Sequence, residues 1–272
     1  MTKKSSTGPV HYDHFEIDII SALSSQLTVA LDSLSEGEMT LPVINALPNS
    51  RGVYQLFHEN KLVYIGKADS LPKRLREHHH KISGRQNITT NQMGFKCLSV
   101  HENWTALAPE SSLISHYKSS ADDECEWNGI GFGTHDPGRI REKTDKPPDG
   151  FDMRYPIRLN WVCDWIEAGE WDLLKLMIAF KDRLPYLFRY KTEEREKKRD
   201  AHYTKGHPDH RGKKVIVERR GMTAEELLVL FTKALPGWQA TAFPSHLILY
   251  NEEKDANYVH GRVLHRELPQ SP

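Results

Sequence analysis

The chain has 272 residues, of which 38% are hydrophobic and 27% are charged, and its 37 Lys and Arg side chains are balanced by 37 Asp and Glu side chains. This composition is typical of a soluble globular protein and excludes a chain that is mainly disordered. No apolar stretch approaches the roughly 20 residues that span a bilayer, and MTKKSSTGPV is followed by acidic residues where a signal peptide needs an apolar run, so we expect a cytoplasmic protein with no membrane role.

Charge is distributed unevenly along the chain. Residues 61–85 contain seven Lys and Arg against two acids, residues 181–220 contain fourteen against seven, and residues 101–126 contain one against six. A basic surface beside an acidic pocket is what a metal-dependent nuclease requires, because phosphate needs cations and a metal ion needs carboxylates. The stretch 181–220 is interpreted first as a solvated helical face, since acids are mixed into it, and second as a surface for the DNA backbone.

The N-terminal segment, residues 1–50, is predicted to contain one helix and a linker. Apolar residues recur at three- and four-residue spacings, which predicts an amphipathic helix that packs on the core. These residues are Ile17, Ile20, Leu23, Leu27, Leu31 and Leu34. Pro42, Pro48 and Asn49 then indicate a linker.

Residues 51–150 are predicted to form the central domain. GVYQLF and KLVYIG, separated by three residues, predict a β-hairpin. The apolar spacing then changes, which predicts a helix from Ser70 to about Ile82, and GFKCLSVH at 94–101 is typical of a third strand. Pro109 introduces a second helix whose first turn contains Glu110.

Glycine, proline and capping residues mark the end of this domain and the elements of the C-terminal extension. WNGIGFGTHDPGR at 127–139 has four glycines and is predicted to be a loop, and the Pro147-Pro148 pair with Gly150 indicates a boundary near residue 150. Residues 160–200 have a helical pattern, clearest in EWDLLKLMIAF, and KKVIVER is typical of a strand. A capping box of Thr223 and Glu226 starts a helix to about Lys233, and strands at HLILY and YVHGRVLH complete an αβ unit.

The cysteine and histidine patterns predict no zinc site. Cys97, Cys125 and Cys163 are far apart and lack a C-x-x-C pair, so we expect buried reduced thiols. HPDH at 207–210 has no partner pair with zinc spacing and is interpreted as a turn.

Five residues match the needs of phosphodiester hydrolysis, which requires an activated water and cations around a phosphorane that gains negative charge. Tyr54 and Tyr64 occupy corresponding places on adjacent predicted strands, so their phenols can share one pocket, and either can take the proton of the water. Lys67 lies just beyond the second strand, where a point charge can reach phosphate. Arg74 and His78 share a helix face, with Arg74 suited to grip phosphate and His78 to exchange a proton.

Each of these residues also has an ordinary structural interpretation. Tyrosines in strands are usually half-buried packing residues, and Arg74 taken alone is a solvated helix charge, as Arg76 and Glu77 are. Three histidines stand in a row at 78–80. Only the first is assigned a role, because consecutive helical residues point in different directions.

Glu110 is the carboxylate that this arrangement offers to a metal ion. It suits Mg²⁺, with Mn²⁺ as the alternative, because Mg²⁺ commonly keeps several waters and accepts one or two protein carboxylates together with substrate phosphate. The ordinary interpretation is an acidic residue at a helix start that favours the helix macrodipole.

The segment 52–128 resembles a known family. GVY at 52–54, YIG at 64–66 and GKADSLPKRLREH at 66–78 resemble the GIY-YIG nuclease signature, in which G-K-A-x-x-L-x-x-R is followed four residues later by an aromatic residue or histidine. Glu110 and Asn128 follow in the order and approximate spacing of the family's metal-binding glutamate and structural asparagine. RLREHHHKI and WNGIGFGTHDPGR are most similar to the GIY-YIG type II restriction endonucleases, whereas repair nucleases of the UvrC type usually carry an aromatic residue in place of His78.

The resemblance implies an α+β fold. Its core would be a small mixed or antiparallel three-stranded sheet flanked by helices, with an N-terminal helix and a C-terminal helical and αβ extension. The resemblance also implies that a tyrosine activates water, Arg74 and Lys67 stabilise the phosphorane, Glu110 holds one divalent metal ion and Asn128 orients the site. Cleavage would leave 5′-phosphate and 3′-hydroxyl ends.

The expected partner is double-stranded DNA, cut by a homodimer on a palindromic site, because twofold protein symmetry matches such sites. Candidate DNA contacts are Lys73, Arg76, His135 and Arg139, and residues 151–272 are expected to recognise DNA or mediate assembly. The alternatives are a repair-like or homing nuclease and a DNA-binding module that has lost the chemistry. Residues 151–272 carry no catalytic constellation of their own.

Overall fold

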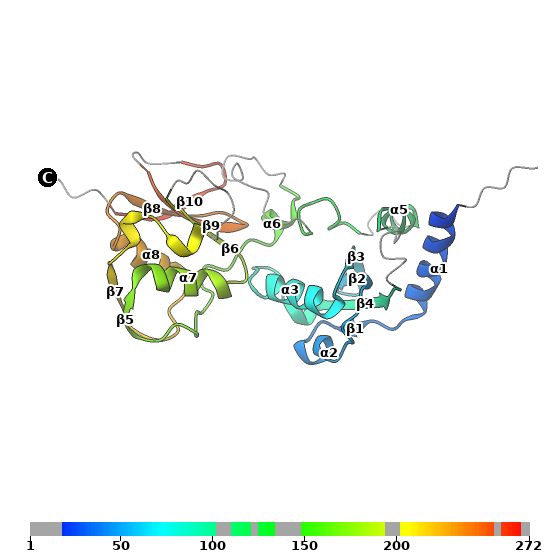
Figure 1. Cartoon of the computed structure of the whole chain (residues 1–272). Coiled ribbons are helices and arrows are strands. Elements are labelled where there is room, and N and C mark those ends of the chain that lie inside the picture. The colour runs from blue at the N-terminus through cyan, green and yellow to red at the C-terminus, as the bar shows by residue number, and fades with distance from the viewer. Residues whose placement is uncertain are drawn as a thin grey trace, which may run out of the picture.

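The computed structural model describes residues 18–101, 110–120, 125–133, 148–193, 202–252 and 257–267, and they form two lobes joined end to end (Figure 1). The N-terminal lobe contains α1 (Ile19–Ser33), β1 (Gly37–Glu38), α2 (Leu41–Asn45), β2 (Gly52–His58), β3 (Lys61–Ala68), α3 (Leu71–Ser83), η1 (Thr90–Gln92), β4 (Met93–Ser99), α5 (Glu110–Ser120) and α6 (Phe151–Arg154). The C-terminal lobe contains β5 (Gly169–Asp172), α7 (Leu173–Arg183), β6 (Leu187–Tyr190), η3 (His202–Lys205), η4 (Pro208–His210), β7 (Lys214–Val217), α8 (Ala224–Lys233), β8 (Trp238–Ala242), β9 (His246–Asn251) and β10 (Arg262–Arg266).

The N-terminal lobe is built on an antiparallel sheet with the strand order β1-β4-β2-β3. Leu56 on one face of the sheet packs with Ile44 of α2 and Leu75 of α3. Ile65 belongs to a second core, which also contains Leu113 of α5 and residues of α1. The predicted α+β class is confirmed, and the sheet has one strand more than the three expected.

The predicted hairpin, helix and third strand are confirmed as β2 with β3, α3 and β4. Glu59 and Asn60 connect the paired residues His58 and Lys61, and they have φ angles of 51° and 64°. A two-residue hairpin loop of this kind needs positive φ at both positions, because that backbone matches the twist of the flanking strands.

The N-terminal segment differs from the prediction in two ways. The helix exists as α1 and buries Leu27 and Leu31, but Ile20 in its first turn is 51% exposed. The predicted linker is wrong, because it contains β1, which pairs with β4, and α2, which buries Ile44. Pro42 stands in the first turn of α2, where a residue without an N–H costs no helical hydrogen bond.

The C-terminal lobe has its own sheet, with the order β10-β8-β9-β6, in which only β6 and β9 run parallel. Phe180 of α7, Phe231 of α8 and Trp238 of β8 are fully buried in its core. The predicted strands appear as β7, β9 and β10, and the capping box of Thr223 and Glu226 starts α8.

The helical prediction for 160–200 is wrong outside α7 in its described part, residues 160–193. Residues 169–172 form β5, which pairs with β7, and Asp172 then caps α7 by accepting a hydrogen bond from the Lys175 N–H. Pro185 follows the helix, and the chain continues as β6. Strand β8 was not predicted, although its sequence WQATA alternates apolar and polar residues; in the structure all five residues are buried.

The lobes meet at Arg85, just after α3. Its side chain is almost fully buried, forms an ion pair with Asp152 at 3.0 Å, and donates hydrogen bonds to the main-chain oxygens of Tyr155 and Pro244. Phe151 is buried in the core of the N-terminal lobe. The chain therefore crosses between the lobes beyond the position expected from the sequence at residue 150.

Several cations of the stretch 181–220 pair with acids. Within its described residues, Arg211 pairs with Glu193, Lys214 with Glu170 and Arg219 with Glu226. The paired side chains are exposed, as expected of a solvated face, but the described part of the stretch is α-helical only at its start, in α7, so the predicted helical face is wrong there. All three cysteines are free, two of them buried and Cys97 half-buried, and no helix in the described ranges is long and apolar enough to cross a membrane.

His210 gives the protein a pH-dependent stability. It lies in η4, the predicted turn, fully buried against Trp238, and burial lowers the pKa of His210 from 6.5 to about 4. Because the unfolded chain binds this proton more tightly, the free energy of unfolding should fall as the pH drops from about 6.5 to 4. Denaturant unfolding at several pH values checks this: His210→Gln should lower the slope of the free energy of unfolding against pH.

Candidate active site

Two tyrosines face each other across the hairpin. Tyr54 on β2 and Tyr64 on β3 have ring centroids 6.1 Å apart, and both side chains are buried. Tyr54 is paired in register with Gly66, where a Cβ atom would lie 2.5 Å from the Tyr54 hydroxyl oxygen. The residue at position 66 must therefore be glycine, because any side chain would displace this phenol.

Helix α3 brings two further predicted residues to the phenols. His78 Nε2 lies 2.8 Å from the Tyr54 hydroxyl, and Arg74 Nε donates to the same hydroxyl oxygen at 3.4 Å. Arg74 also pairs with the Glu77 carboxylate at 3.0 Å, which holds its guanidinium at the edge of the cluster. Tyr54, Tyr64, Arg74 and His78 are thus gathered in one place, as the sequence predicted.

The environment sets the charge state of this cluster. Burial raises the pKa of both Tyr54 and Tyr64, whereas the positive charge of Arg74 acts in the opposite direction on each phenol. Burial also holds the pKa of His78 well below its usual value, and the charges of Arg74 and Lys81 act in the same direction. His78 is therefore neutral near pH 7, and its Nε2 can accept a hydrogen bond from the Tyr54 hydroxyl.

Phe132, which was given no role from the sequence, lies in a loop that forms one wall of the cluster. The Phe132 ring stacks on the His78 imidazole, with centroids 4.9 Å apart and 16° between planes, and meets Tyr64 edge-on at 5.1 Å. A Cβ atom at the next residue, Gly133, would lie 2.3 Å from the Tyr64 hydroxyl oxygen. The Gly-Phe-Gly sequence was the available signal: an apolar ring between two glycines in a polar loop.

Asn128 binds the main chain beside Tyr64. Its Oδ1 accepts from the Ile65 N–H and its Nδ2 donates to the Ile65 oxygen, both at 2.9 Å. The N–H groups of Cys125 and Trp127 bond to the neighbouring oxygens of Leu62 and Val63. Residues 125–128 therefore close the free edge of β3, and Asn128 supports the strand that carries Tyr64.

We expect Asn128→Asp to destabilise the domain by about 1–3 kcal/mol, because the carboxylate cannot donate to the Ile65 oxygen and leaves it unpaired. Denaturant unfolding measures this loss. Asn87→Asp removes an amide donor that bonds the Arg154 oxygen at an exposed site and should change the free energy of unfolding by less than about 0.5 kcal/mol. Equal effects of the two variants would contradict the supporting role of Asn128.

Glu110 begins α5 and is half-buried, with no hydrogen bond or ion pair among the described residues. Its charge contributes to raising the pKa of Tyr64, which places the carboxylate near that phenol. Helix α1 holds α5 near both ends, since Ser24 bonds Ser112 and the Tyr117 hydroxyl donates to Asp32. The predicted Pro109 lies outside the described residues.

The remaining predicted residues are less tied to the cluster. Lys67 on β3 is exposed and forms no hydrogen bond or ion pair in the described chain, so its ammonium is available to a ligand. Lys73 and Arg76 are exposed on α3, and Arg76 donates to Asn45 of α2. His135 and Arg139 lie outside the described residues.

A metal ion at this site would depend on the carboxylate of Glu110. Among the described residues, no three His, Cys, Asp or Glu side chains converge as metal ligands. The single carboxylate of Glu110 is compatible with Mg²⁺, because this ion needs few protein ligands when waters and substrate phosphate complete its coordination shell.

We expect His78→Ala to cost about 2–4 kcal/mol of stability, because it removes a buried ring and the partner of a buried hydroxyl. Two residues further along α3, His80 is exposed, and His80→Ala should cost less than about 0.5 kcal/mol. Thermal or denaturant unfolding of both variants provides the comparison. A His78→Ala protein as stable as the wild type would contradict the contacts described for this ring.

Comparison with known proteins identifies relatives of this part of the chain. Residues 48–161 match the family described as the Eco29kI GIY-YIG domain. Curated relatives include the UvrABC system protein C of Helicobacter pylori strains P12 and G27, each 37% identical over 90 residues, or 29% of this chain. The match spans about 15% of the length of these relatives. All residues gathered around the two tyrosines fall inside the matched range 48–161.

Proposed function

We infer that the GIY-YIG domain at residues 48–161 makes this chain an endonuclease that hydrolyses phosphodiester bonds of double-stranded DNA with a divalent metal ion. The observation that carries this inference is the cluster of Tyr54, Tyr64, Arg74 and His78, with Glu110 beside Tyr64. The cluster supplies a base, a cation and a carboxylate, which are the groups that phosphodiester hydrolysis needs.

The two tyrosines are assigned different tasks. Tyr54 is 1% exposed and its hydroxyl is already bonded to His78 and Arg74. Tyr64 is 7% exposed and lies near the Glu110 charge. Tyr64 is therefore better placed to take the proton of the attacking water once its own proton has left, which the positive charge of a metal ion held by Glu110 would favour. The Tyr54 hydroxyl, held by His78, contacts Arg74.

The cations act on the phosphorane. Arg74 presents a planar fork that can bond two phosphate oxygens, and the exposed Lys67 adds a point charge. Glu110 would hold the metal ion, which is Mg²⁺ or Mn²⁺ in this proposal and supplies positive charge to the reacting phosphate. Attack by water with departure of the 3′ oxygen leaves 5′-phosphate and 3′-hydroxyl ends.

We propose further that the chain is a sequence-specific type II restriction endonuclease, acting as a homodimer on a palindromic site. His78 supports this, because the restriction branch resembled by RLREHHHKI carries histidine where UvrC-type nucleases carry an aromatic residue. The match of residues 48–161 to the Eco29kI GIY-YIG domain supports it as well. The C-terminal lobe, which lies almost wholly beyond this match, would supply recognition or assembly.

Incubation of the full chain with plasmid DNA and Mg²⁺ tests both levels of the proposal. Discrete fragments support a restriction endonuclease, and sequencing their ends gives the site, its symmetry and the overhang. Random nicking or branch-specific cutting favours the alternative of a repair-like or homing nuclease. Absence of cleavage on any duplex, with binding retained, favours a module that has lost the chemistry.

A further inference from the structure

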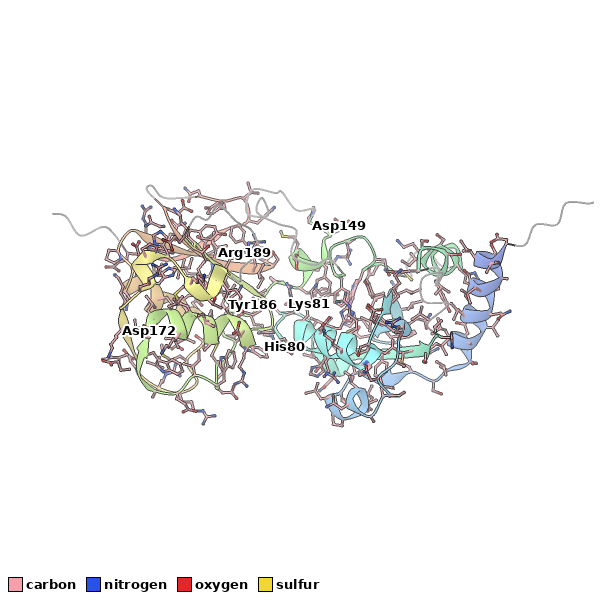
Figure 2. The ribbon with its side chains drawn as sticks, viewed as in Figure 1. His80, Lys81, Asp149, Asp172, Tyr186 and Arg189 are labelled. Atoms are coloured by element: carbon pink, nitrogen blue, oxygen red, sulfur yellow. The ribbon has the colours of Figure 1, made fainter. Side chains whose placement is uncertain are left out.

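Lys81 connects helix α3 to the loop beside the candidate active site. It stands three residues after His78, near the end of α3 that faces the C-terminal lobe (Figure 2). Its Nζ donates to the main-chain oxygen of Phe132. The same ammonium lies 4.8 Å from the centroid of the Phe132 ring and 5.2 Å from that of Phe151. One cation thus holds a main-chain oxygen and two aromatic faces.

Phe132 links Lys81 to the side chains of His78 and Tyr64. Its ring is 2% exposed and contacts both the His78 imidazole and the Tyr64 phenol. Gly133, the next residue, abuts the Tyr64 hydroxyl so closely that no side chain fits there. A displacement of Phe132 would therefore change the surroundings of both the phenol and the imidazole.

Further attachments of this loop lie earlier along the chain. Asn128 and residues 125–127 bind the edge of β3, and the Ile130 oxygen accepts from the Phe151 N–H. Between Ile130 and Gly133 lie a glycine with a φ of 100° and Phe132 itself. The bond from Lys81 attaches the loop at Phe132, one residue before the point where it meets Tyr64.

We propose that Lys81 is a positioning residue, which fastens Phe132 to α3 and so holds residues 131–133 against Tyr64 and His78. The inference rests on the phosphodiester hydrolysis proposed above. Direct phosphate binding is the competing role for a lysine near a nuclease site. It is disfavoured because this side chain is half-buried and its ammonium already binds Phe132.

Lys81→Met tests the role, because it keeps the length of the side chain and removes the ammonium. We expect kcat for DNA cleavage to fall about 10- to 100-fold, since small misplacements of reacting groups have effects of this size, while KM stays within about twofold. Amide hydrogen exchange of residues 125–133 should become faster without DNA. Lys81→Arg should restore both, because a guanidinium can donate to the same oxygen and lie over the same rings.

Lys96→Met is the matched control, because Lys96 also lies over an aromatic ring, that of Phe57 at 5.4 Å, in the same lobe. Its kinetics and loop exchange should match the wild type. Phe132→Leu, with Lys81 intact, should reproduce the loss of kcat and provides the test if Lys81→Met does not fold.

Two results would overturn the proposal. Unchanged amide hydrogen exchange of residues 125–133 in Lys81→Met would show that Lys81 does not fasten the loop. A loss confined to KM, with a weaker salt dependence of DNA binding, identifies Lys81 as a phosphate contact instead. A wild-type chain that cuts no DNA refutes the proposed function alone, and the exchange data on Lys81→Met and Lys81→Arg still decide whether Lys81 fastens the loop.

Discussion

Arg74→Ala should reduce kcat for DNA cleavage by about 10²–10³-fold or more, because it removes the cation that would face the charge developing on the phosphorane. Arg74 is the one arginine that contacts the phenols in the described chain, through its bond to the Tyr54 hydroxyl. The fold should survive, since Tyr54 retains His78 as a partner. Single-turnover cleavage of a DNA substrate measures the change.

Two further variants test whether the effect comes from the charge of Arg74, from the shape of its guanidinium, or from the loss of any arginine. Arg74→Lys keeps a positive charge but loses the planar fork, so an intermediate rate is expected. Arg154→Ala is the control: Arg154 pairs with Glu126 at 3.1 Å, much as Arg74 pairs with Glu77 at 3.0 Å, but lies on α6 without contact to the phenols. DNA cleavage by Arg74→Ala at the wild-type rate would exclude the assigned role.

Glu110→Gln should lower the rate of metal-dependent cleavage about as much as Arg74→Ala does. It replaces the carboxylate that would hold the metal ion with a neutral amide of nearly the same shape. Stability should change little, since Glu110 has no hydrogen-bond or ion-pair partner among the described residues. The rate measured against Mg²⁺ and Mn²⁺ concentration, together with DNA affinity in the absence of cleavage, distinguishes lost metal binding from lost DNA binding.

Glu126→Gln is the matched control for the acidic segment. Glu126 lies in the same net-negative stretch of sequence and its ion pair with Arg154 is partly exposed, so its loss should cost no more than about 1 kcal/mol. Cleavage by this variant should stay near the wild-type rate. If Glu126→Gln and Glu110→Gln lowered activity equally, the effect would belong to the general acidity of the segment and not to one ligand.

The predictions made from the sequence were best where the determining interactions are local. The pairing of β2 with β3 follows from two apolar runs and a short turn, and the shared face of Arg74 and His78 follows from their spacing of four residues on a helix. The prediction of an N-terminal linker was wrong because the determining interaction there is long-range. Residues 37–38 become a strand only because β4, more than fifty residues later, offers a free edge.

The sequence by itself determined which residue types stand at which local spacing: two tyrosines in a hairpin, then a cationic helix face, then a carboxylate at a helix start. Only the tertiary structure decided what surrounds them. Tyr54 meets His78 across 24 residues, Lys81 meets Phe132 across 51 and Asn128 meets Ile65 across 63. Burial and neighbouring charge, which set the pKa values of the phenols and the imidazole, arise from these distant contacts and cannot be derived from local spacing.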